Sequence, residues 1–291
     1  MPGWGPELAV LLGLVEGLTE FLPVSSTGHL IIVGHVLGFT GAVAARVEIS
    51  IQLGSILAII AYERSNLASL LSQAAQEQAS LRALIRSNQT REWGTILSRS
   101  TDTHRNLWFL LGLGVAFVPA GVIGLVAHPW IEAYLFHPRT VAAALIVGGL
   151  IILGVEARGN RVRFNRLDQI GVVTAWWVGL AQCVSLIPGV SRSGATIVGG
   201  LLVGMDRKVA TEYSFFLALP TMVAATTYKM LKSNELLTNE DFFALALGLL
   251  VSFLVAWAVI AAFLAFVKRH SLRAFAYYRM LVGITVLLVF R

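Results

Sequence analysis

Charge is the scarcest property of this sequence. Only 13% of its 291 residues are Asp, Glu, Lys or Arg, whereas 56% are hydrophobic. A soluble domain carries about 25% charged residues, so this scarcity excludes an ordinary soluble protein and indicates an integral membrane protein. A nucleic-acid-binding protein would need a soluble basic surface. No segment supplies one, and we expect no nucleic-acid partner.

Cysteine and early basic residues are also lacking. Cys183 is the single cysteine, which excludes an internal disulfide. No Lys or Arg precedes Arg46. The N-terminus therefore lacks the basic region of a cleaved signal peptide, and we expect none.

The hydrophobic residues gather into segments of helical length. A membrane-spanning helix needs about 20 apolar residues, so we expect an all-α, polytopic membrane protein. The first two segments are too short to span and are separated by a polar turn, which predicts a broken or re-entrant helix. The expected apolar segments are 8–22, 29–37, 48–62, 106–127, 140–155, 213–231, 242–267 and 274–290.

The links between these segments carry the topological signal. Basic residues collect in cytoplasmic loops, which predicts that the Arg-rich link 156–169 and the basic link 268–273 face the cytoplasm. The segment 63–105 holds six Arg and four acidic residues and predicts an exposed, largely helical cytoplasmic insertion. The acidic link 232–241 suits the outside.

The first polar motif, EGLTEFLPVSSTGHL, covers residues 16–30. Glu16 and Glu20 lie four apart and share one face of a helix, which Pro23 is expected to end. Ionisable groups at membrane depth are rare and usually functional; a polar helix end among lipid headgroups is the alternative. The candidate site residues of this motif are Glu16, Glu20, Ser25, Ser26, Thr27 and His29.

The second polar motif is PGVSRSGATI, residues 188–197, and Arg192 is the only cation in its long apolar surroundings. A helix opening at Gly194 and Ala195 would form an anion site together with Arg192. An alternative is that Arg192 pairs with Glu16 or Glu20 for stability alone. The candidate residues here are Ser191, Arg192, Ser193 and Thr196.

The two motifs belong to a weak internal repeat. A shift of 166 positions aligns Ser25 with Ser191, which suggests a shared structural or phosphate-binding role, and Ser26 with Arg192, so these two differ. We predict a first repeat at 1–155, including the insertion 63–105, and a second at 156–291, within one membrane domain. The charges of the links give the halves inverted topology, with the broken segments meeting near the membrane midplane.

Together the motifs suit the handling of an anionic phosphate group. Glu16 and Glu20 repel one another unless one is protonated or both bind a cation, and carboxylate oxygens prefer Mg²⁺ or Ca²⁺. Gln52 either hydrogen-bonds a phosphate or Ser26, or is a helix-packing amide.

Both motifs, with IQLGSILA at residues 51–58 between them, resemble the bacterial undecaprenyl-diphosphate phosphatase family, which is also linked to bacitracin resistance. The resemblance covers nearly the full chain except the insertion. It implies hydrolysis of undecaprenyl diphosphate to the monophosphate, which recycles the lipid carrier of peptidoglycan synthesis. It also implies a site that opens to the periplasmic side of the bacterial cytoplasmic (inner) membrane. The resemblance makes Glu16 and Glu20 the family's acidic pair, the first motif its Ser/His turn and the second its phosphate-gripping turn.

We expect Ser26 to be the nucleophile, activated by a carboxylate or by His29; attack by His29 itself, or by water with His29 as base, stays open. The expected partners are a polyprenyl diphosphate lipid and the membrane, and a homo-oligomer is left open. The alternative function is a transporter or flippase for a phosphorylated isoprenoid lipid or anion, because inverted repeats with broken helices are a transporter architecture. A purely structural scaffold would leave the buried charges unexplained.

Three lesser expectations concern polar residues away from the motifs. Glu212 is expected to pair with Arg207, and Asp168 to cap the following helix. His104 is expected to be solvated.

Overall fold

The computed structural model describes residues 5–39, 42–87, 100–101, 103–159, 161–232 and 239–290. These residues form helices and no β-strand, apart from an isolated bridge between Phe164 and Met205, so the all-α prediction is confirmed. Two short 3₁₀ helices are η1 (Leu167–Gln169) and η2 (Val184–Leu186). The α-helices are α1 (Pro6–Thr19), α2 (Ser26–Val36), α3 (Ala42–Ser87), α5 (Arg105–Leu135), α6 (Pro138–Arg158), α7 (Val172–Cys183), α8 (Arg192–Val203), α9 (Arg207–Lys232), α10 (Asn239–Val267) and α11 (Arg273–Val289).

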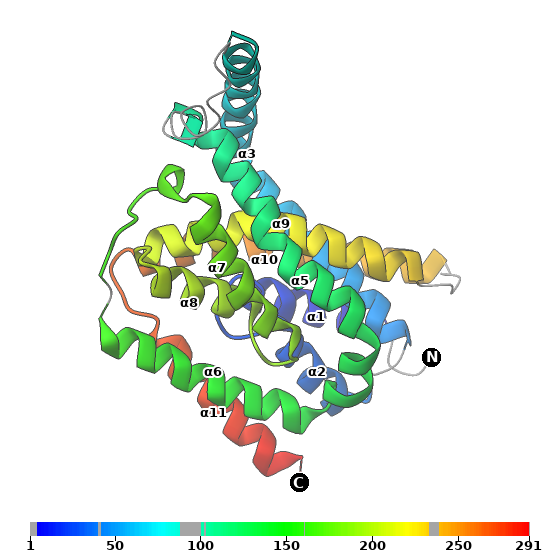
Figure 1. Ribbon diagram of the computed structural model, residues 1–291. Helices are drawn as coiled ribbons and strands as arrows, with labels where there is room; N and C mark the ends of the chain where they lie inside the picture. The colour runs from blue at the N-terminus through cyan, green and yellow to red at the C-terminus, as the bar shows by residue number, and fades with distance from the viewer. Residues whose placement is uncertain are drawn as a thin grey trace.

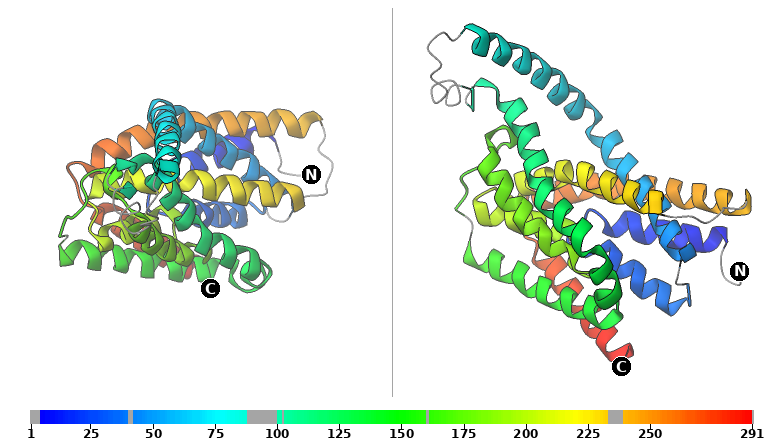
Figure 2. Two further views of the ribbon diagram at one scale, coloured as in Figure 1. Left: turned by 45° about the horizontal axis from the view of Figure 1, so that its top comes forward. Right: turned by 45° about the vertical axis from the view of Figure 1, so that its right-hand side comes forward.

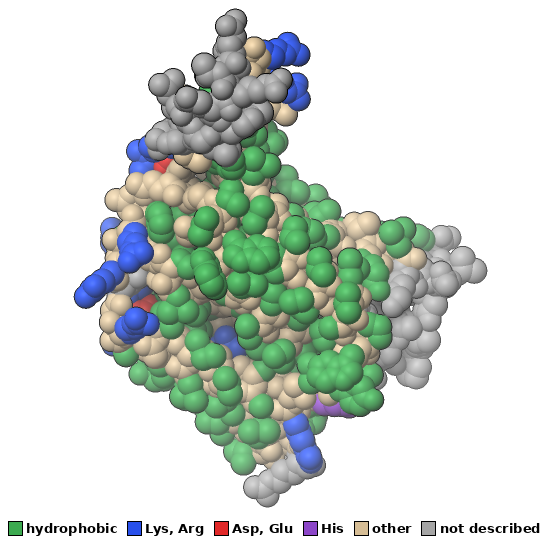
Figure 3. All heavy atoms as spheres, in the orientation of Figure 1, with side chains coloured by type: hydrophobic (Ala, Val, Ile, Leu, Met, Phe, Trp, Pro, Cys, Tyr) green, Lys and Arg blue, Asp and Glu red, His purple; other side chains and the backbone are tan. Residues whose placement is uncertain are grey.

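The surface of the bundle is apolar, as a membrane protein requires. Within the described ranges, three stretches are long and apolar enough to cross a membrane: Arg105–Ala127, Pro138–Arg158 and Phe242–Val267. Figure 3 shows hydrophobic side chains over most of the middle of the molecule. Soluble proteins rarely expose a contiguous apolar patch of this extent to water, so this surface indicates contact with lipid. The chain is a multi-pass membrane protein.

Helix α3 is longer than the sequence predicts. It runs for 46 residues, so the apolar segment 48–62 and the first part of the insertion form one helix. Its outer part projects beyond the bundle (Figures 1 and 2). Residues 63–87 are therefore helical, as predicted, while 88–99 lie outside the described residues.

The prediction that His104 is solvated is wrong. The side chain is 4% exposed and its Nε2 lies 2.7 Å from the Ser80 hydroxyl of α3. The chain returns to α3 here, and the Glu77 carboxylate of that helix accepts a hydrogen bond of 2.7 Å from the Leu107 amide in the first turn of α5. His104 is thus packed between two helices, and its contact is structural.

Two broken helical hairpins are built alike. Helices α1 and α2 begin at Pro6 and Ser26, and α7 and α8 begin 166 positions later at Val172 and Arg192. Helix α1 packs along α10, and α7 packs along α5. The helix starts thus follow the sequence repeat; the inverted topology and the division at residue 155 stay predictions.

Helix α9 runs through the interior and packs against helices that contact both hairpins. It packs against α3, α5, α8 and α10, and its Tyr213, Phe215 and Leu217 are fully buried. The Phe215 ring meets that of Phe21, in the turn after α1, edge to face at 5.2 Å. The core therefore fixes the first polar turn against the middle of the bundle.

The predicted pairing of Glu212 with Arg207 is wrong. Arg207 forms a two-pronged contact with Glu156 at the end of α6, at 2.9 and 2.6 Å, and Glu212 lies 3.5 Å from Lys208. The Glu156 carboxylate also accepts the Leu272 amide at 3.0 Å. Arg207 pairs with Glu156 because the Glu156 side chain is buried where α6, the start of α9 and the residue before α11 meet. Glu212, in contrast, lies on the same helix as Arg207.

The predicted capping role of Asp168 is also wrong. Helix α7 begins after Gly171 without a side-chain cap. Asp168 lies in η1 and pairs instead with Arg166 at 2.8 Å and Arg105 at 3.4 Å. The short 3₁₀ turn separates Asp168 from the first amides of α7.

The two basic links meet at one edge of the molecule. Arg158, Arg161 and Arg163 after α6, and Lys268 after α10, line a common cavity of about 1160 Å³. Figure 3 shows basic side chains along its left edge, where the ribbon of Figure 1 places the end of α6 and the link between α10 and α11. This agrees with the prediction that links 156–169 and 268–273 lie on one side of the membrane.

Candidate active site

The first turn begins earlier than expected. Helix α1 ends at Thr19, one turn before Pro23. Proline has no amide hydrogen to donate to the carbonyl four residues before it, so Pro23 leaves the Thr19 carbonyl without a helical partner. Helix α2 then starts at Ser26, and the hydroxyl of its N-cap Ser25 accepts the Gly28 amide at 3.2 Å.

The second turn repeats this construction. Helix α8 starts at Arg192, two residues before the predicted start at Gly194. The hydroxyl of its N-cap, Ser191, accepts the Gly194 amide at 3.0 Å. Serine is a preferred N-cap because its hydroxyl satisfies an amide that has no partner within the helix. Ser25 and Ser191 therefore share a structural role, because each is the N-cap of the helix that follows it.

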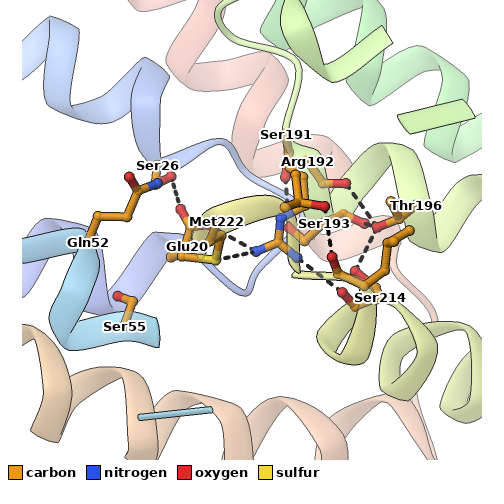
Figure 4. Close-up of polar contacts among 12 residues, drawn as sticks. Glu20, Ser26, Gln52, Ser55, Ser191, Arg192, Ser193, Thr196, Ser214 and Met222 are labelled. Carbon is orange, nitrogen blue, oxygen red and sulfur yellow. Dashed lines mark hydrogen bonds and ion pairs between the residues drawn. The ribbon is translucent and has the colours of Figure 1, made fainter. Parts of the chain in front are cut away.

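The two turns meet through Glu20. One carboxylate oxygen of Glu20 lies 2.9 Å from Nη2 of Arg192, and the other accepts a hydrogen bond from the Ser26 hydroxyl (Figure 4). Arg192 also donates to the Ser214 carbonyl at 3.2 Å and lies over the Phe21 ring. The side chains of Glu20 and Arg192 are 7% and 13% exposed. A hydroxyl, a carboxylate and a guanidinium are therefore joined in a nearly dry site.

These groups line a cavity of about 170 Å³. Since a water molecule occupies about 30 Å³ in the liquid, this space is large enough for a phosphate group and too small for a long isoprenoid chain. The walls come from both turns and from α3 and α9. The lining residues are Glu20, Ser25, Ser26, Thr27, Gln52, Ser185, Val190, Ser191, Arg192, Thr221, Met222 and Ala225.

Two predicted binding hydroxyls, those of Ser193 and Thr196, lie outside the residues that line the cavity. The Ser193 hydroxyl donates to the Leu22 carbonyl of the first turn at 2.7 Å, and Thr196 Oγ1 lies 2.6 Å from the Ser214 hydroxyl of α9. Both side chains are fully buried and are not among those lining the cavity. They hold the second turn in place, while Ser191 is both a cap and part of the wall.

Gln52 makes the predicted helix-packing contact and also lies at the cavity wall; its hydrogen bond to a phosphate or to Ser26 stays a prediction. It lines the cavity, and in Figure 4 its side chain extends from α3 toward Ser26. Its amide oxygen also accepts a hydrogen bond from Thr226 of α9 at 3.2 Å. Gln52 therefore packs two helices and presents an amide at the cavity wall.

Helix α9 supplies wall residues that the sequence analysis missed. Thr221 and Met222 line the cavity, and the Met222 sulfur accepts from Nη2 of Arg192 at 3.3 Å. Their one sequence signal is Pro220, a proline within an otherwise continuous helix.

Glu16 lies one helical turn before Glu20 and is 2% exposed. Its Oε1 is buried and has no hydrogen-bond partner, and the residue is not among those lining the cavity. The described part of the chain holds no group of three His, Cys, Asp or Glu side chains placed to bind a metal ion. Mg²⁺, however, is commonly bound by one or two carboxylates together with substrate phosphates. The unpartnered oxygen of Glu16 beside Glu20 fits that mode.

His29 faces away from the cavity. Its Nδ1 lies 2.7 Å from the Ser25 carbonyl and its Nε2 lies 2.9 Å from the hydroxyl of Tyr278 on α11. A carbonyl only accepts, which assigns the proton of the neutral ring to Nδ1 and leaves Nε2 to accept from Tyr278. The structure thus brings Ser26 to Glu20 and gives His29 a partner that the sequence analysis missed.

Comparison with known proteins places this site in a family. Residues 9–285 match the family described as "Bacitracin resistance protein BacA". The chain is 45% identical over 280 residues to an undecaprenyl-diphosphatase of Caldanaerobacter subterraneus subsp. tengcongensis, covering 96% of this chain and 94% of that protein. It is 44% identical over 284 residues to an undecaprenyl-diphosphatase of Ectopseudomonas mendocina, covering 98% of this chain and 94% of that protein. The chain therefore belongs to the BacA family of bacitracin resistance proteins.

Proposed function

We propose that this membrane enzyme hydrolyses undecaprenyl diphosphate to undecaprenyl phosphate and inorganic phosphate, which recycles the lipid carrier of peptidoglycan synthesis. Relatives across nearly the full length carry that activity in their names. The observation that carries the proposal for this chain is the contact of the Ser26 hydroxyl with the Glu20 carboxylate, beside Arg192.

The cavity suits the head of the lipid rather than its tail. The first residues of α2 and α8 line it, so the N-termini of two helices contribute partial positive charge there. Arg192 adds a full charge with a planar fork that matches phosphate oxygens. The isoprenoid chain stays in the bilayer, against the apolar outer surface.

Ser26 is the proposed nucleophile. Glu20 takes the hydroxyl proton while the Ser26 oxygen attacks the terminal phosphorus; the bond from that phosphorus to the bridging oxygen breaks, and undecaprenyl phosphate leaves. Water then attacks the phosphorus of the phosphoserine, and the bond from that phosphorus to the Ser26 oxygen breaks. Ser26 takes back the proton that Glu20 holds, and inorganic phosphate leaves with the protons of the water molecule. Arg192 stabilises the charge on the transferred phosphoryl oxygens. His29, held by Tyr278, is outside this sequence of steps.

Glu16 and Glu20 are the residues that would hold a divalent cation, Mg²⁺ or Ca²⁺. Such an ion supplies neutralisation of the diphosphate charge when bound. The unpartnered Oε1 of Glu16 supports this assignment.

We place the protein in the bacterial inner membrane with the site open to the periplasm. The positive-inside rule assigns the edge formed by links 156–169 and 268–273 to the cytoplasm. The N-terminal end of α1 lies toward the opposite edge in Figure 1, and the helix runs from there into the molecule, where the first turn follows Thr19.

The test is phosphate release by the purified full-length protein in detergent, with undecaprenyl diphosphate and Mg²⁺. We expect turnover by the wild type and a loss of orders of magnitude in Ser26→Ala. Ser55→Ala is the matched control, because Ser55 is a buried serine that contacts Ser252 outside the cavity. A transporter would need no nucleophile, so the absence of phosphate release, together with exchange of the lipid across vesicle leaflets, would contradict the proposal.

A further inference from the structure

Arg279 of α11 is a fully buried cation with an unusual set of partners. The residue is 2% exposed, in the apolar segment 274–290. Its guanidinium donates to four backbone carbonyls and to no carboxylate: Leu145 at 3.0 Å, Ala144 at 3.2 Å, Pro23 at 3.2 Å and Gly189 at 2.9 Å. A buried charge without a counter-ion is costly. An apolar residue would fill this position at a lower cost, so the guanidinium calls for an explanation.

Two of these acceptors belong to the two active-site turns. Pro23 lies in the turn between α1 and α2, and Gly189 in the turn before α8. They occupy the same position in the internal repeat, since 189 is 23 plus the repeat shift of 166. The other two acceptors lie on α6. One side chain thus joins equivalent points of the two turns and fixes both to a membrane helix.

The turns need such donors. Buried backbone carbonyls outside regular helices must find a partner. Gly189 adopts a positive φ of 93° and lies between η2 and α8, outside any helix that could supply a regular partner for its carbonyl. The guanidinium offers five donors in a rigid plane, which matches several carbonyls at once, whereas a lysine offers its donors from a single point.

The same contact controls the register of the groups that meet at the cavity. Ser26 follows Pro23 by three residues, and Arg192 follows Gly189 by three. A Cβ added at Gly194, in the first turn of α8, would lie 3.3 Å from Nη1 of Arg279. A shift of either turn against Arg279 therefore moves the nucleophile relative to the phosphate-binding arginine.

We infer that Arg279 is a positioning residue for the diphosphatase reaction, which clamps both phosphate-binding turns in the register that catalysis requires. The inference rests on the proposed function for its readout. Arg279 does not touch the substrate, and it acts through the backbone of the two turns.

The chain offers a variant that disturbs Arg279 without replacing it. A Cβ at Gly148 of α6 would overlap the guanidinium of Arg279, because the Arg279 Cζ would lie only 2.6 Å from it. A Cβ at Gly154, on the same helix, would meet nothing within 4 Å. Gly148→Ala and Gly154→Ala are therefore a matched pair. Val286→Ala serves as a second control, since Val286 is a buried residue of α11, seven positions after Arg279.

The experiment measures kcat and the inhibition constant of inorganic pyrophosphate for Arg279→Lys, for the probe Gly148→Ala and for the controls Gly154→Ala and Val286→Ala. Each variant is assayed well below its own melting temperature. We expect kcat to fall at least tenfold in Arg279→Lys and at least threefold in Gly148→Ala. The inhibition constant should rise at least threefold in both, because pyrophosphate must be gripped by both turns. Gly154→Ala and Val286→Ala should stay within twofold of the wild type.

The inhibition constant separates positioning from stability. A merely structural role lowers the fraction of active protein and leaves that constant unchanged, and this result in Arg279→Lys and Gly148→Ala would overturn the inference. If the wild type releases no phosphate, the proposed function fails instead. The clamp is then judged from the rise in melting temperature caused by pyrophosphate, which both variants should reduce and both controls retain; an undiminished rise in both variants overturns the clamp.

Discussion

Glu20 and Arg192 stand 172 positions apart in the chain and meet at 2.9 Å, Glu20 directly after the end of α1 and Arg192 as the first residue of α8. The contact fits either a stabilising ion pair or a resting state of the site. A buried pair is weak evidence for stability by itself. The Ser26 hydroxyl on the other oxygen of Glu20 favours the catalytic interpretation, because a structural pair needs no nucleophile beside it.

Arg192→Lys tests whether the site needs the planar, multiply donating guanidinium or only a positive charge. Arg192 reaches Glu20, the Ser214 carbonyl and Met222 at the same time, and an ammonium cannot reproduce this geometry. We expect kcat to fall by about 10²-fold, the effect of losing one donor to a developing oxyanion. Arg158→Lys, at the exposed basic edge, is the control and should leave turnover unchanged. Near-wild-type turnover of Arg192→Lys would place the phosphate site elsewhere.

The acidic pair is tested by Glu20→Gln and Glu16→Gln, measured across a titration of Mg²⁺ and with a chelator. Glu20→Gln should abolish turnover, because it removes both the proton acceptor of Ser26 and a cation ligand. Glu16→Gln should be milder and should raise the Mg²⁺ concentration for half-maximal rate, since the second repeat already carries Gln182 at this position.

Glu212→Gln controls for the loss of a carboxylate away from the cavity. An unchanged Mg²⁺ response in both acidic variants would show that Glu16 and Glu20 do not hold a cation.

The sequence predicted what depends on local chemistry. Ser25 and Ser191 stand three residues before a glycine in both copies of the repeat, and both became N-caps. The meeting of Glu20 with Arg192 followed from the cost of leaving either charge alone in an apolar protein. The two N-caps and the contact between Glu20 and Arg192 could be predicted because each depends on residue spacing or on a scarce residue type.

The parts that were missed depend on tertiary contacts. Nothing in the periodicity of segment 274–290 indicates that Tyr278 reaches His29 or that Arg279 reaches both turns. His104 looked solvated because its neighbours are polar, yet the return of the chain against α3 buries it. Similarly, Ser193 and Thr196 have the composition of a phosphate-binding turn, but the Ser193 hydroxyl is turned toward the Leu22 carbonyl of the first turn and the Thr196 hydroxyl toward Ser214 of α9.

Tyr278→Phe tests whether His29 is bypassed. The substitution removes the hydrogen bond of 2.9 Å to Nε2 and keeps the ring that stacks on His29 at 5.7 Å. Because this contact lies outside the cavity, we expect turnover within threefold of the wild type. Tyr277→Phe, on the exposed surface of the same helix, is the matched control. A tenfold change confined to Tyr278→Phe would bring His29 into the reaction.

The last prediction concerns the attacking group and separates two adjacent serines. Ser25 caps α2 and adopts a positive φ of 74°, so its side chain holds the turn, whereas Ser26 contacts the proton acceptor Glu20. Ser26→Ala should lose turnover by orders of magnitude while pyrophosphate still binds. Ser25→Ala should weaken binding and cost about 1 kcal/mol of stability, the usual penalty for losing a cap.

Ser25→Gly provides the matched control, because glycine tolerates the positive φ and costs a cap position only a few tenths of a kcal/mol. Ser25→Gly should therefore recover most of the stability lost in Ser25→Ala but not the lost wall hydroxyl. Mass spectrometry of protein quenched during turnover should find the phosphoryl group on Ser26. A phosphoryl group on His29, or robust turnover by Ser26→Ala, would transfer the nucleophilic role to the imidazole or to water. The Glu20 carboxylate would then activate a water molecule at the position that the Ser26 hydroxyl now occupies.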